Sequence, residues 1–248
     1  MLLLFMTRAK MKVSIIIPFF NKFHLVHSRL MELYKHVPKE DIEIILVNDA
    51  STEEKIDESV AWWQKHLNYH KIRYTINSEN LGFGGAMNRG AEIAEGDVLV
   101  FLSNDVIVSG NFVAQILEKI NDEVLIGAEV IYYPAGWNEF DVSGGKMVLP
   151  WANGWLLACT RKVWDALGGF DPRYGKYSYE DLDLTITAMD LGYSIIALRS
   201  EFAKHIGAQT APYDAKRMEY TKRNREIFIE KWQDKLPSIH ARLIRDGR

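Results

Sequence analysis

The sequence predicts an α/β fold in which a mainly parallel central sheet is flanked by helices. Two features of the pattern support this prediction: short apolar runs alternate with amphipathic stretches through the first half of the chain, and polar residues follow each run. The chain has 248 residues, of which 48% are hydrophobic and 25% are charged. A chain of this size and composition can bury the core of one large domain.

Strands are expected where the apolar runs are continuous over about five residues, because such runs are typical of strands buried on both faces of a parallel sheet. In the first half the expected strands are residues 13–18, 42–47, 72–76 and 98–102.

Helices are expected between these strands, where apolar residues recur at helical spacing. Phe112, Val113 and Ile116 fall on one face of such a helix, and Ser51 or Thr52 could cap another. The expected helices are residues 23–34, 53–67, 84–94 and 111–120.

The second half of the chain is less regular. Residues 155–160 and 194–198 predict two further strands, and residues 182–191 and 213–232 predict two helices. Residues 136–151 are rich in Gly, Pro and aromatic side chains and predict a long loop that could contain a hairpin. Without an internal repeat or a clear linker, we expect a single domain over residues 1–248.

Charge and cysteine content exclude some classes of protein. The net charge of −3 gives no overall reason to expect specific nucleic-acid binding. The single cysteine, Cys159, allows neither an intramolecular disulfide nor a cysteine metal site, and its apolar surroundings predict a buried, inert thiol. The apolar residues 1–6 are too few to span a bilayer, which needs roughly 20. We expect a cytoplasmic protein without a signal peptide.

A basic stretch near the C-terminus leaves two interpretations open. It could be a solvated helix face, or it could contact phosphates of a donor, an acidic polymer or a membrane lipid. In the last case the protein would associate peripherally with the inner face of the membrane. The basic residues are Lys216, Arg217, Lys222, Arg223 and Arg225.

Polar residues follow the four strands expected in the first half. Asn21, Asp49, Asn80 and Asp105 each come at or soon after the end of one strand. Ligands of open parallel sheets bind beyond the carboxyl ends of the strands, so these residues predict one polar binding rim. The alternative is that Asn and Asp serve only as helix caps and turn residues.

A glycine-rich segment, residues 80–90, follows the third strand and opens a helix. Such a turn lets the backbone approach a phosphate at the helix N-terminus. A dinucleotide fingerprint would need glycine at 82, 84 and 87, but residue 87 is Met, and the chain contains no P-loop. The sequence therefore disfavours a nicotinamide dehydrogenase and an ATPase.

Two further groups of residues suggest chemistry. Asp105 at a strand end could bind a divalent cation, and His205 could be a second ligand or a structural histidine. Glu180-Asp181-Leu182-Asp183 opens a helix, where acidic residues are favoured by the helix dipole, and could also supply a general base.

Taken in order, these stretches resemble family 2 glycosyltransferases, which have the GT-A fold. The resemblance runs from about residue 13 to about residue 209 and is greatest to bacterial rhamnosyltransferase-like members. The matching stretches are residues 14–21, 47–51, 80–90, 101–106, 168–171, 180–184 and 192–193.

The resemblance implies a nucleotide-binding half at about residues 11–106, an acceptor and catalytic half at about 107–210, and a C-terminal helix at about 213–232. It implies that Asp181, with Glu180 beside it, is the base, and that Asp105 and His205 ligate Mn²⁺ or Mg²⁺. The residues implied to bind the nucleotide sugar are Pro18, Phe20, Asn21, Asp49, Asn80, Gly82, Gly85, Asn88, Ser103, Asn104 and Asp105.

One position departs from the family pattern. The first Asp of the D-x-D motif is Ser103 here. A hydroxyl can hydrogen-bond a ribose but adds no charge to a metal site, so we expect weaker metal binding than in members with both carboxylates.

The predicted function is transfer of a sugar, with inversion, from a UDP-, dTDP- or GDP-sugar to a hydroxyl of a glycan, a lipid-linked glycan or another polymer. One alternative is a nucleotidyltransferase, which usually has a glycine-rich basic loop after the first strand, where this chain has Pro18-Phe19-Phe20-Asn21. The other is an inactive nucleotide-sugar-binding protein.

Overall fold

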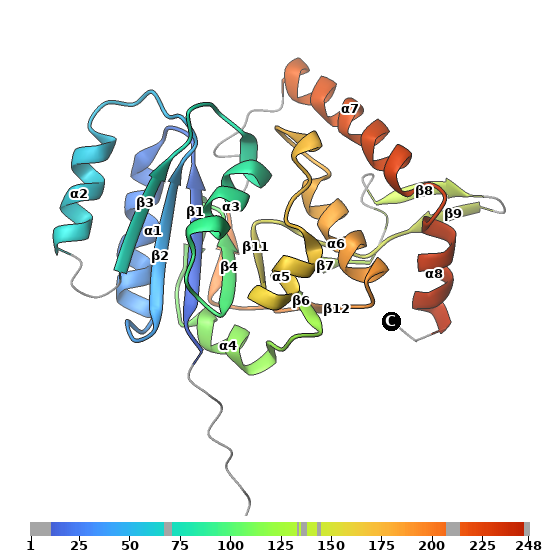
Figure 1. Cartoon of the computed structure of the whole chain (residues 1–248), viewed down its shortest axis with the longest axis horizontal. Helices are drawn as coiled ribbons and strands as arrows, with labels where there is room; N and C mark the ends of the chain where they lie inside the picture. Colours follow the sequence, from blue (N-terminus) through green and yellow to red (C-terminus); the bar gives the residue numbers. More distant parts are fainter. Residues whose placement is uncertain are drawn as a thin grey trace, which may run out of the picture.

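The computed structural model describes residues 11–66, 71–132, 134, 138–142, 145–206 and 214–245, and within them seven strands form one central sheet (Figure 1). Their order is β12-β6-β11-β4-β1-β2-β3. The pairings are parallel except that β11 runs antiparallel to both β4 and β6. The predicted α/β class with a mainly parallel sheet is confirmed. The strands are β1 Val13–Phe19, β2 Ile42–Asn48, β3 Lys71–Ile76, β4 Val98–Leu102, β6 Val124–Gly127, β11 Leu156–Thr160 and β12 Ser194–Ala197.

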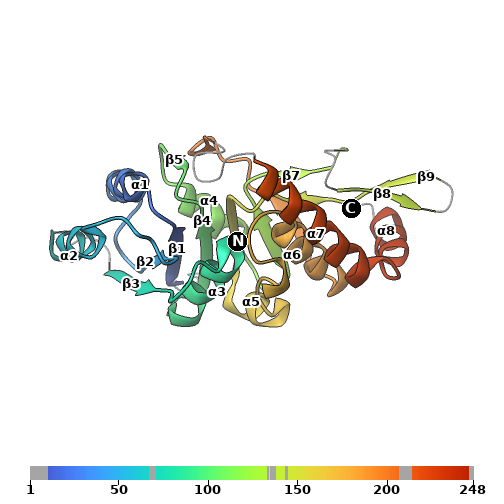
Figure 2. The same ribbon diagram turned by 90° about the horizontal axis from the view of Figure 1, so that it is seen from above.

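Helices cover both faces of this sheet (Figure 2). Successive side chains of a strand point to opposite faces, so Ile15 of β1 packs in one hydrophobic cluster and Ile16 in another. The first cluster includes side chains of α1 Phe23–His36, α2 Ile56–His66 and α4 Phe112–Lys119. The second includes side chains of α3 Gly82–Ile93, α5 Arg161–Leu167 and α6 Glu180–Asp190.

The expected strands and helices are present, with ends that differ by up to three residues. The second helix begins at Ile56 rather than residue 53, and α3 begins at Gly82 rather than residue 84. Residues 67 and 213 of two predicted helices lie outside the described residues. The sequence did not predict β6, α5 or a last helix, α8 Leu236–Arg245.

Short strand pairs surround the ends of the sheet. β5 Val106–Val108 pairs with β13 Ala203–His205, and β7 Val130–Ile131 pairs with β10 Trp151–Ala152. The predicted loop at residues 136–151 contains a hairpin of β8 Glu139–Val142 and β9 Gly145–Val148, and residues 136, 137, 143 and 144 lie outside the described part.

Helix α7, Ala215–Trp232, lies against α6 and the short helix η1 Pro172–Tyr174 (Figures 1 and 2). Its Phe228 and Trp232 join Leu182 and Ile186 of α6 in a third hydrophobic cluster, which also contains Ile239 of α8.

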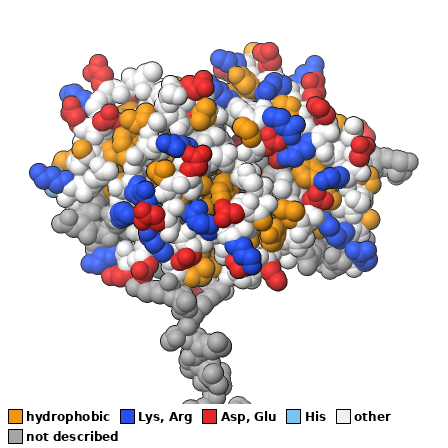
Figure 3. All heavy atoms as spheres, viewed as in Figure 1, with side chains coloured by type: hydrophobic (Ala, Val, Ile, Leu, Met, Phe, Trp, Pro, Cys, Tyr) orange, Lys and Arg blue, Asp and Glu red, His pale blue; other side chains and the backbone are white. Residues whose placement is uncertain are grey.

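The surface carries charges of both signs, and the face in Figure 3 shows Lys and Arg side chains interspersed with Asp and Glu. Cys159 is fully buried in β11, as predicted. Among the described residues, the helices are all too short or too polar to cross a membrane.

Candidate active site

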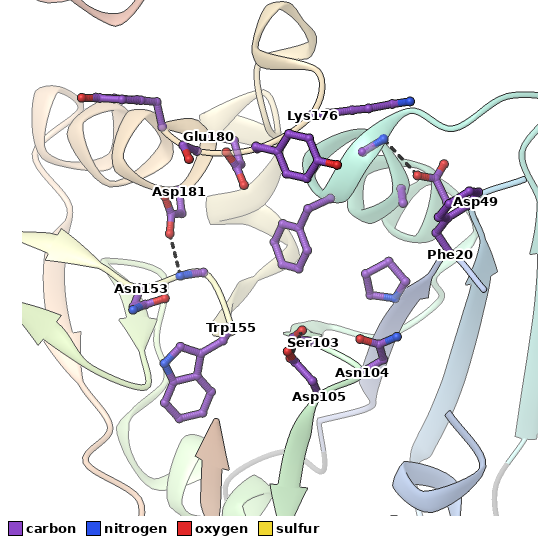
Figure 4. A pocket seen from close by; sticks show the side chains of 18 of the residues that line it. Phe20, Asp49, Ser103, Asn104, Asp105, Asn153, Trp155, Lys176, Glu180 and Asp181 are labelled. Carbon is purple, nitrogen blue, oxygen red and sulfur yellow. Dashed lines mark hydrogen bonds between the residues drawn. The ribbon is translucent and has the colours of Figure 1, made fainter. Parts of the chain in front are cut away.

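A cavity of about 600 Å³ lies at the carboxyl ends of β1, β2 and β4, between the central sheet and the start of α6 (Figure 4). Its position is the one expected for a ligand of an open parallel sheet. Most of the predicted site residues line it. They are Pro18, Phe20, Asp49, Asn80, Gly82, Ser103, Asn104, Asp105, Glu180, Asp181 and His205.

Asp49 follows β2 and holds the start of α3. Its carboxylate accepts hydrogen bonds from the backbone N–H groups of Leu81 and Gly82, both at 2.9 Å, and from Asn77 Nδ2 at 2.8 Å. Its side chain is buried but still borders the cavity. The two interpretations of this residue are therefore compatible, because Asp49 caps a helix at the edge of the cavity.

Gly82, at the start of α3, has φ +78°, which favours glycine. A Cβ atom here would lie 2.3 Å from the carbonyl oxygen of Gly175, so only glycine allows this close approach. The contact brings the start of α3 next to the segment that leads into α6.

Asn21, Gly85 and Asn88 lie outside the cavity lining. The side chain of Asn21 accepts hydrogen bonds from the backbone of Thr52 and Glu53, which connects the ends of β1 and β2. Asn88 makes a pair of hydrogen bonds with the backbone N–H and C=O of Phe170, at 2.9 and 2.8 Å. Asn21 and Asn88 therefore hydrogen-bond to other parts of the protein. The ligand contacts predicted for Asn21, Gly85 and Asn88 stay predictions.

Ser103, Asn104 and Asp105 lie together across the cavity from Glu180 and Asp181 (Figure 4). Ser103 Oγ donates to Asp105 Oδ1 at 2.6 Å, and His205 Nε2 lies 3.1 Å from the same oxygen. Burial opposes ionisation of Asp105, but the hydrogen bonds from His205 and Ser103 outweigh it and hold its pKa below the usual value. The His205 ring stacks on Trp155 with a ring-centroid distance of 5.7 Å.

A divalent cation would suit this donor set, because a carboxylate is a ligand that Mn²⁺ and Mg²⁺ prefer and a neutral imidazole is a common metal ligand. Across the described part of the chain, no group of three or more His, Cys, Asp or Glu side chains is placed to hold a metal. A cation between Asp105 and His205 would therefore take its other ligands from a bound diphosphate and from water.

Asn104 carries unused hydrogen-bonding capacity at the cavity wall. The residue is 3% exposed, and its Nδ2 has no partner among the described residues. Leaving a buried amide donor unpaired costs roughly 1–3 kcal/mol. An acceptor oxygen on a bound ligand would remove this cost.

Glu180 and Asp181 form the first turn of α6 and face the cavity. Asp181 accepts hydrogen bonds at 2.9 Å from the backbone N–H of Gly154 and of Leu182, so its orientation is fixed. Burial raises the pKa of Asp181, an effect that these hydrogen bonds partly offset. Burial and the neighbouring Asp181 carboxyl raise the pKa of Glu180 to about 8.

Several lining residues were not among the predicted site residues. Trp151 belongs to β10, and Asn153 and Gly154 come from the turn between β10 and β11. Lys176 precedes α6, and Arg217 reaches the cavity from the first turn of α7. The basic stretch is therefore divided: Lys216, Lys222 and Arg223 are exposed, whereas Arg217 borders the cavity and Arg225 stacks over the Phe140 ring at 5.0 Å.

The family model and a curated relative both identify this chain as similar to glycosyltransferases. The sequence model of Glycosyl transferase family 2 matches residues 14–171, which is more than half of the chain. A poly(ribitol-phosphate) beta-glucosyltransferase of Bacillus spizizenii is 38% identical over 96 residues, which cover 38% of this chain but only 15% of that protein. The chain thus spans a small part of this relative.

Solved structures with the same fold include GalNAc-T7 with UDP, GalNAc and Mn²⁺ (TM-score 0.67, 18% identity, 92% of this chain and 49% of that one). Another is a mannosyltransferase from Pyrobaculum calidifontis in complex with GDP-Man and Mn²⁺ (TM-score 0.60, 19% identity, 76% of this chain and 55% of that one). At these identities the likeness shows the fold.

Proposed function

Since the chain belongs to glycosyl transferase family 2 and shares its fold with GT-A proteins, we propose that it transfers a sugar from a nucleoside-diphosphate sugar to a hydroxyl group, with inversion at the anomeric carbon. The observation that carries the proposal is one cavity with Glu180 and Asp181 on one side and Ser103, Asn104 and Asp105 on the other (Figure 4). A donor between them would expose its anomeric carbon to an acceptor beside the acidic pair.

In the proposed reaction Asp181 takes the proton of the acceptor hydroxyl. The acceptor oxygen forms a bond to the anomeric carbon from the face opposite the nucleotide, and the bond from that carbon to the phosphate oxygen breaks. The nucleoside diphosphate leaves with both electrons of that bond. The N–H groups of Gly154 and Leu182 each hold one carboxylate oxygen of Asp181 at 2.9 Å, which fixes the orientation of the carboxylate, and the remaining lone pairs of these oxygens can accept the acceptor proton.

Asp105 and His205 would hold a divalent cation, whose charge, when it is bound, stabilises the leaving diphosphate. The arrangement of Ser103 supports the expectation that the site is weaker than one with two carboxylates. Its hydroxyl donates to Asp105, so it adds no ligand charge and competes for the same carboxylate oxygen.

For the donor, the two solved structures name UDP and GDP-Man as bound nucleotides, which supports a UDP- or GDP-sugar. The resemblance to rhamnosyltransferases is not supported by these comparisons. The relative from Bacillus spizizenii is named for poly(ribitol-phosphate), which supports a hydroxyl of a polymer as the acceptor. The exposed basic residues of α7 would suit an acidic polymer or an anionic membrane surface.

Release of the nucleoside diphosphate from a panel of UDP-, GDP- and dTDP-sugars with Mn²⁺ tests the proposal. The wild-type chain should turn over at least one donor, and Asp181→Asn should lower kcat by roughly 10²–10⁴-fold while donor affinity stays nearly unchanged. Glu180→Gln is the matched control, because it changes the adjacent carboxyl. A dead Glu180→Gln beside an active Asp181→Asn would move the base to Glu180. No turnover by the wild type of any donor that it binds would indicate an inactive binding protein.

A further inference from the structure

The segment before the acidic pair, residues 173–179, is supported along most of its length by α7. We call it the lead-in segment, because it ends directly at Glu180. Backbone, hydroxyl and aromatic contacts all contribute to this support. The pairs are Arg173 O with Arg223 Nη2 at 3.0 Å, Ser178 with Thr221 at 3.2 Å, and the rings of Tyr177 with Tyr220 at 5.7 Å and of Tyr179 with Phe228 at 5.6 Å.

The lead-in segment has a strained backbone. Tyr177, Ser178 and Tyr179 have φ values of 64°, 65° and 75°, and none of them is glycine. Each left-handed residue of this kind costs roughly 1–2 kcal/mol. Such a run persists only when the surrounding structure holds it, and its last residue immediately precedes α6.

Asn224 of α7 is at the centre of this support. It is fully buried, and its Nδ2, which carries two hydrogens, lies within hydrogen-bond distance of four carbonyl oxygens: those of Tyr174 at 2.9 Å, Lys176 at 3.4 Å, Ser178 at 3.0 Å and also Tyr177. Carbonyl groups converge in this way because the left-handed turn folds the backbone around the amide. An aspartate of the same shape would place oxygen against these oxygens, so the site requires an amide donor.

We infer that Asn224 is a positioning residue, which holds the left-handed turn that presents Glu180 and Asp181 to the cavity. This inference rests on the proposed function for its catalytic consequence, but the geometry stands independently. Asn224 lies on the acidic-pair side of the cavity and makes none of the contacts of Asp49 or Asp105. It also lies beyond residue 171, where the match to the family ends. The support is thus outside the part of the chain that the family model describes.

A positioning role predicts a separation of binding from turnover. Displacing a catalytic group by about 1 Å can cost roughly 100-fold in rate. Lys176 of the lead-in segment also lines the cavity, but the groups proposed to hold the diphosphate and its cation, Asp105 and His205, lie on the opposite wall. Donor affinity should therefore change far less than kcat. A merely stabilising role would instead lower the melting temperature without selective loss of kcat.

Asn224→Ala tests this, with Ile239→Ala as the matched control. Ile239 is 1% exposed and packs in the third hydrophobic cluster with Phe228 and Trp232 of α7. It lies on α8, away from the lead-in segment (Figure 1). Each variant is characterised by its melting temperature, by the amide hydrogen exchange of residues 174–183, by the Kd of UDP or GDP with Mn²⁺, and by kcat and KM for the donor that the wild type turns over.

For Asn224→Ala we expect faster exchange confined to residues 174–183, a nucleotide Kd within about two-fold of wild type, and a kcat lower by about ten-fold or more at unchanged donor KM. Ile239→Ala should lose stability without that pattern. Unchanged exchange or unchanged kcat in Asn224→Ala would overturn the inference. If Asn224→Ala does not fold, Asn224→Ser retains a single donor and should show the same pattern with smaller amplitude. Should the wild type turn over no donor, the proposed function fails, and the exchange measurement still decides whether Asn224 holds the turn.

Discussion

Glu180 and Asp181 occupy successive positions at the start of α6, so the charge on either carboxyl affects the proton on the other. Burial raises the pKa of both, and that of Glu180 reaches about 8. A folded carboxyl that keeps its proton above the ordinary glutamate pKa of 4.5 binds protons more tightly than the unfolded chain does. Stability and turnover should therefore respond to pH in opposite directions.

Between about pH 4.5 and about pH 8, unfolding releases the Glu180 proton. The stabilisation from this group is complete below about 4.5 and is lost as the pH rises through about 8, so the melting temperature should fall over this window. Turnover should instead rise with pH on the acid side, because the proposed base Asp181 must be ionised and burial raises its pKa. Melting curves and initial rates at a series of pH values measure both. Glu180→Gln should flatten the pH dependence of melting, and equal slopes in the two proteins would contradict the raised pKa.

At the residue level, the sequence was most informative where strand ends carry polar side chains. Asp49, Asn104 and Asp105 follow buried strands and reach the same cavity because parallel strands end at one edge. Lys176 was not predicted, and Arg217 was predicted only as one of five basic residues that could either contact phosphates or lie on a solvated helix face, since the approach of both to the cavity depends on how α6 and α7 pack. Contacts between segments that are distant in the chain produce no pattern in the local sequence.

The start of α3 is the element that joins the two sides of the cavity. Asp49 holds its first backbone N–H groups, and Gly82 touches the backbone at Gly175. Gly82→Ala should lower the free energy of unfolding by more than the roughly 1–3 kcal/mol of backbone strain alone, because the new Cβ collides with a carbonyl oxygen.

Gly192→Ala is the control for this change. Gly192 has φ +91°, but a Cβ there meets nothing within 4 Å, so the substitution adds strain without a collision. Urea unfolding of both variants separates the two effects. If Gly82→Ala lowers the free energy of unfolding by no more than Gly192→Ala does, the close approach of Gly82 to Gly175 does not restrict the segment before α6.

Among the elements, the strands buried on both faces were the easiest to predict from the sequence. The long apolar runs of β1, β2 and β4 were recognisable because both of their faces are buried. β6 has only four residues and α5 only seven, which is too short for a periodic pattern. Their structure is determined by neighbours: β6 lies between β11 and β12, and α5 covers the face that contains Phe101.

For the whole molecule, α7 and α8 connect the second half of the chain to the hairpin through the cluster around Phe228 and Trp232. Buried Asp183 accepts hydrogen bonds from Trp232 Nε1 at 2.6 Å, Lys231 Nζ at 2.8 Å and Tyr174 Oη at 3.0 Å. We propose that residues 11–245 act as one domain, with the donor bound by the first half and the acceptor by the second.

Trp232→Phe tests the connection between α7 and α6. It retains a buried aromatic ring and removes a hydrogen bond to a charged group, so the free energy of unfolding should fall by about 1.5–3 kcal/mol in urea denaturation. Lys162→Met is the control, because the Lys162–Asp122 pair is largely exposed and contributes little. A single unfolding transition in both variants is expected of one domain, and two transitions would indicate separate domains.

The antiparallel pairing of β11 with β4 fixes the positions of Gly154 and Asp105 relative to each other. Leu156 pairs with Leu102, and Ser103 N–H donates to Trp155 O at 2.9 Å, so Gly154 and Asp105 lie a few residues beyond the same rung. The pairing of β11 with β4 therefore sets the distance between Gly154, which holds the proposed base Asp181, and Asp105, which lies at the site proposed for the leaving diphosphate. One residue inserted ahead of Trp155 would shift Gly154 by a strand step of about 3.3 Å, several times the tolerance of about 0.5 Å in a catalytic site. The turn before β11 can therefore change its side chains over evolutionary time more readily than it can change its length.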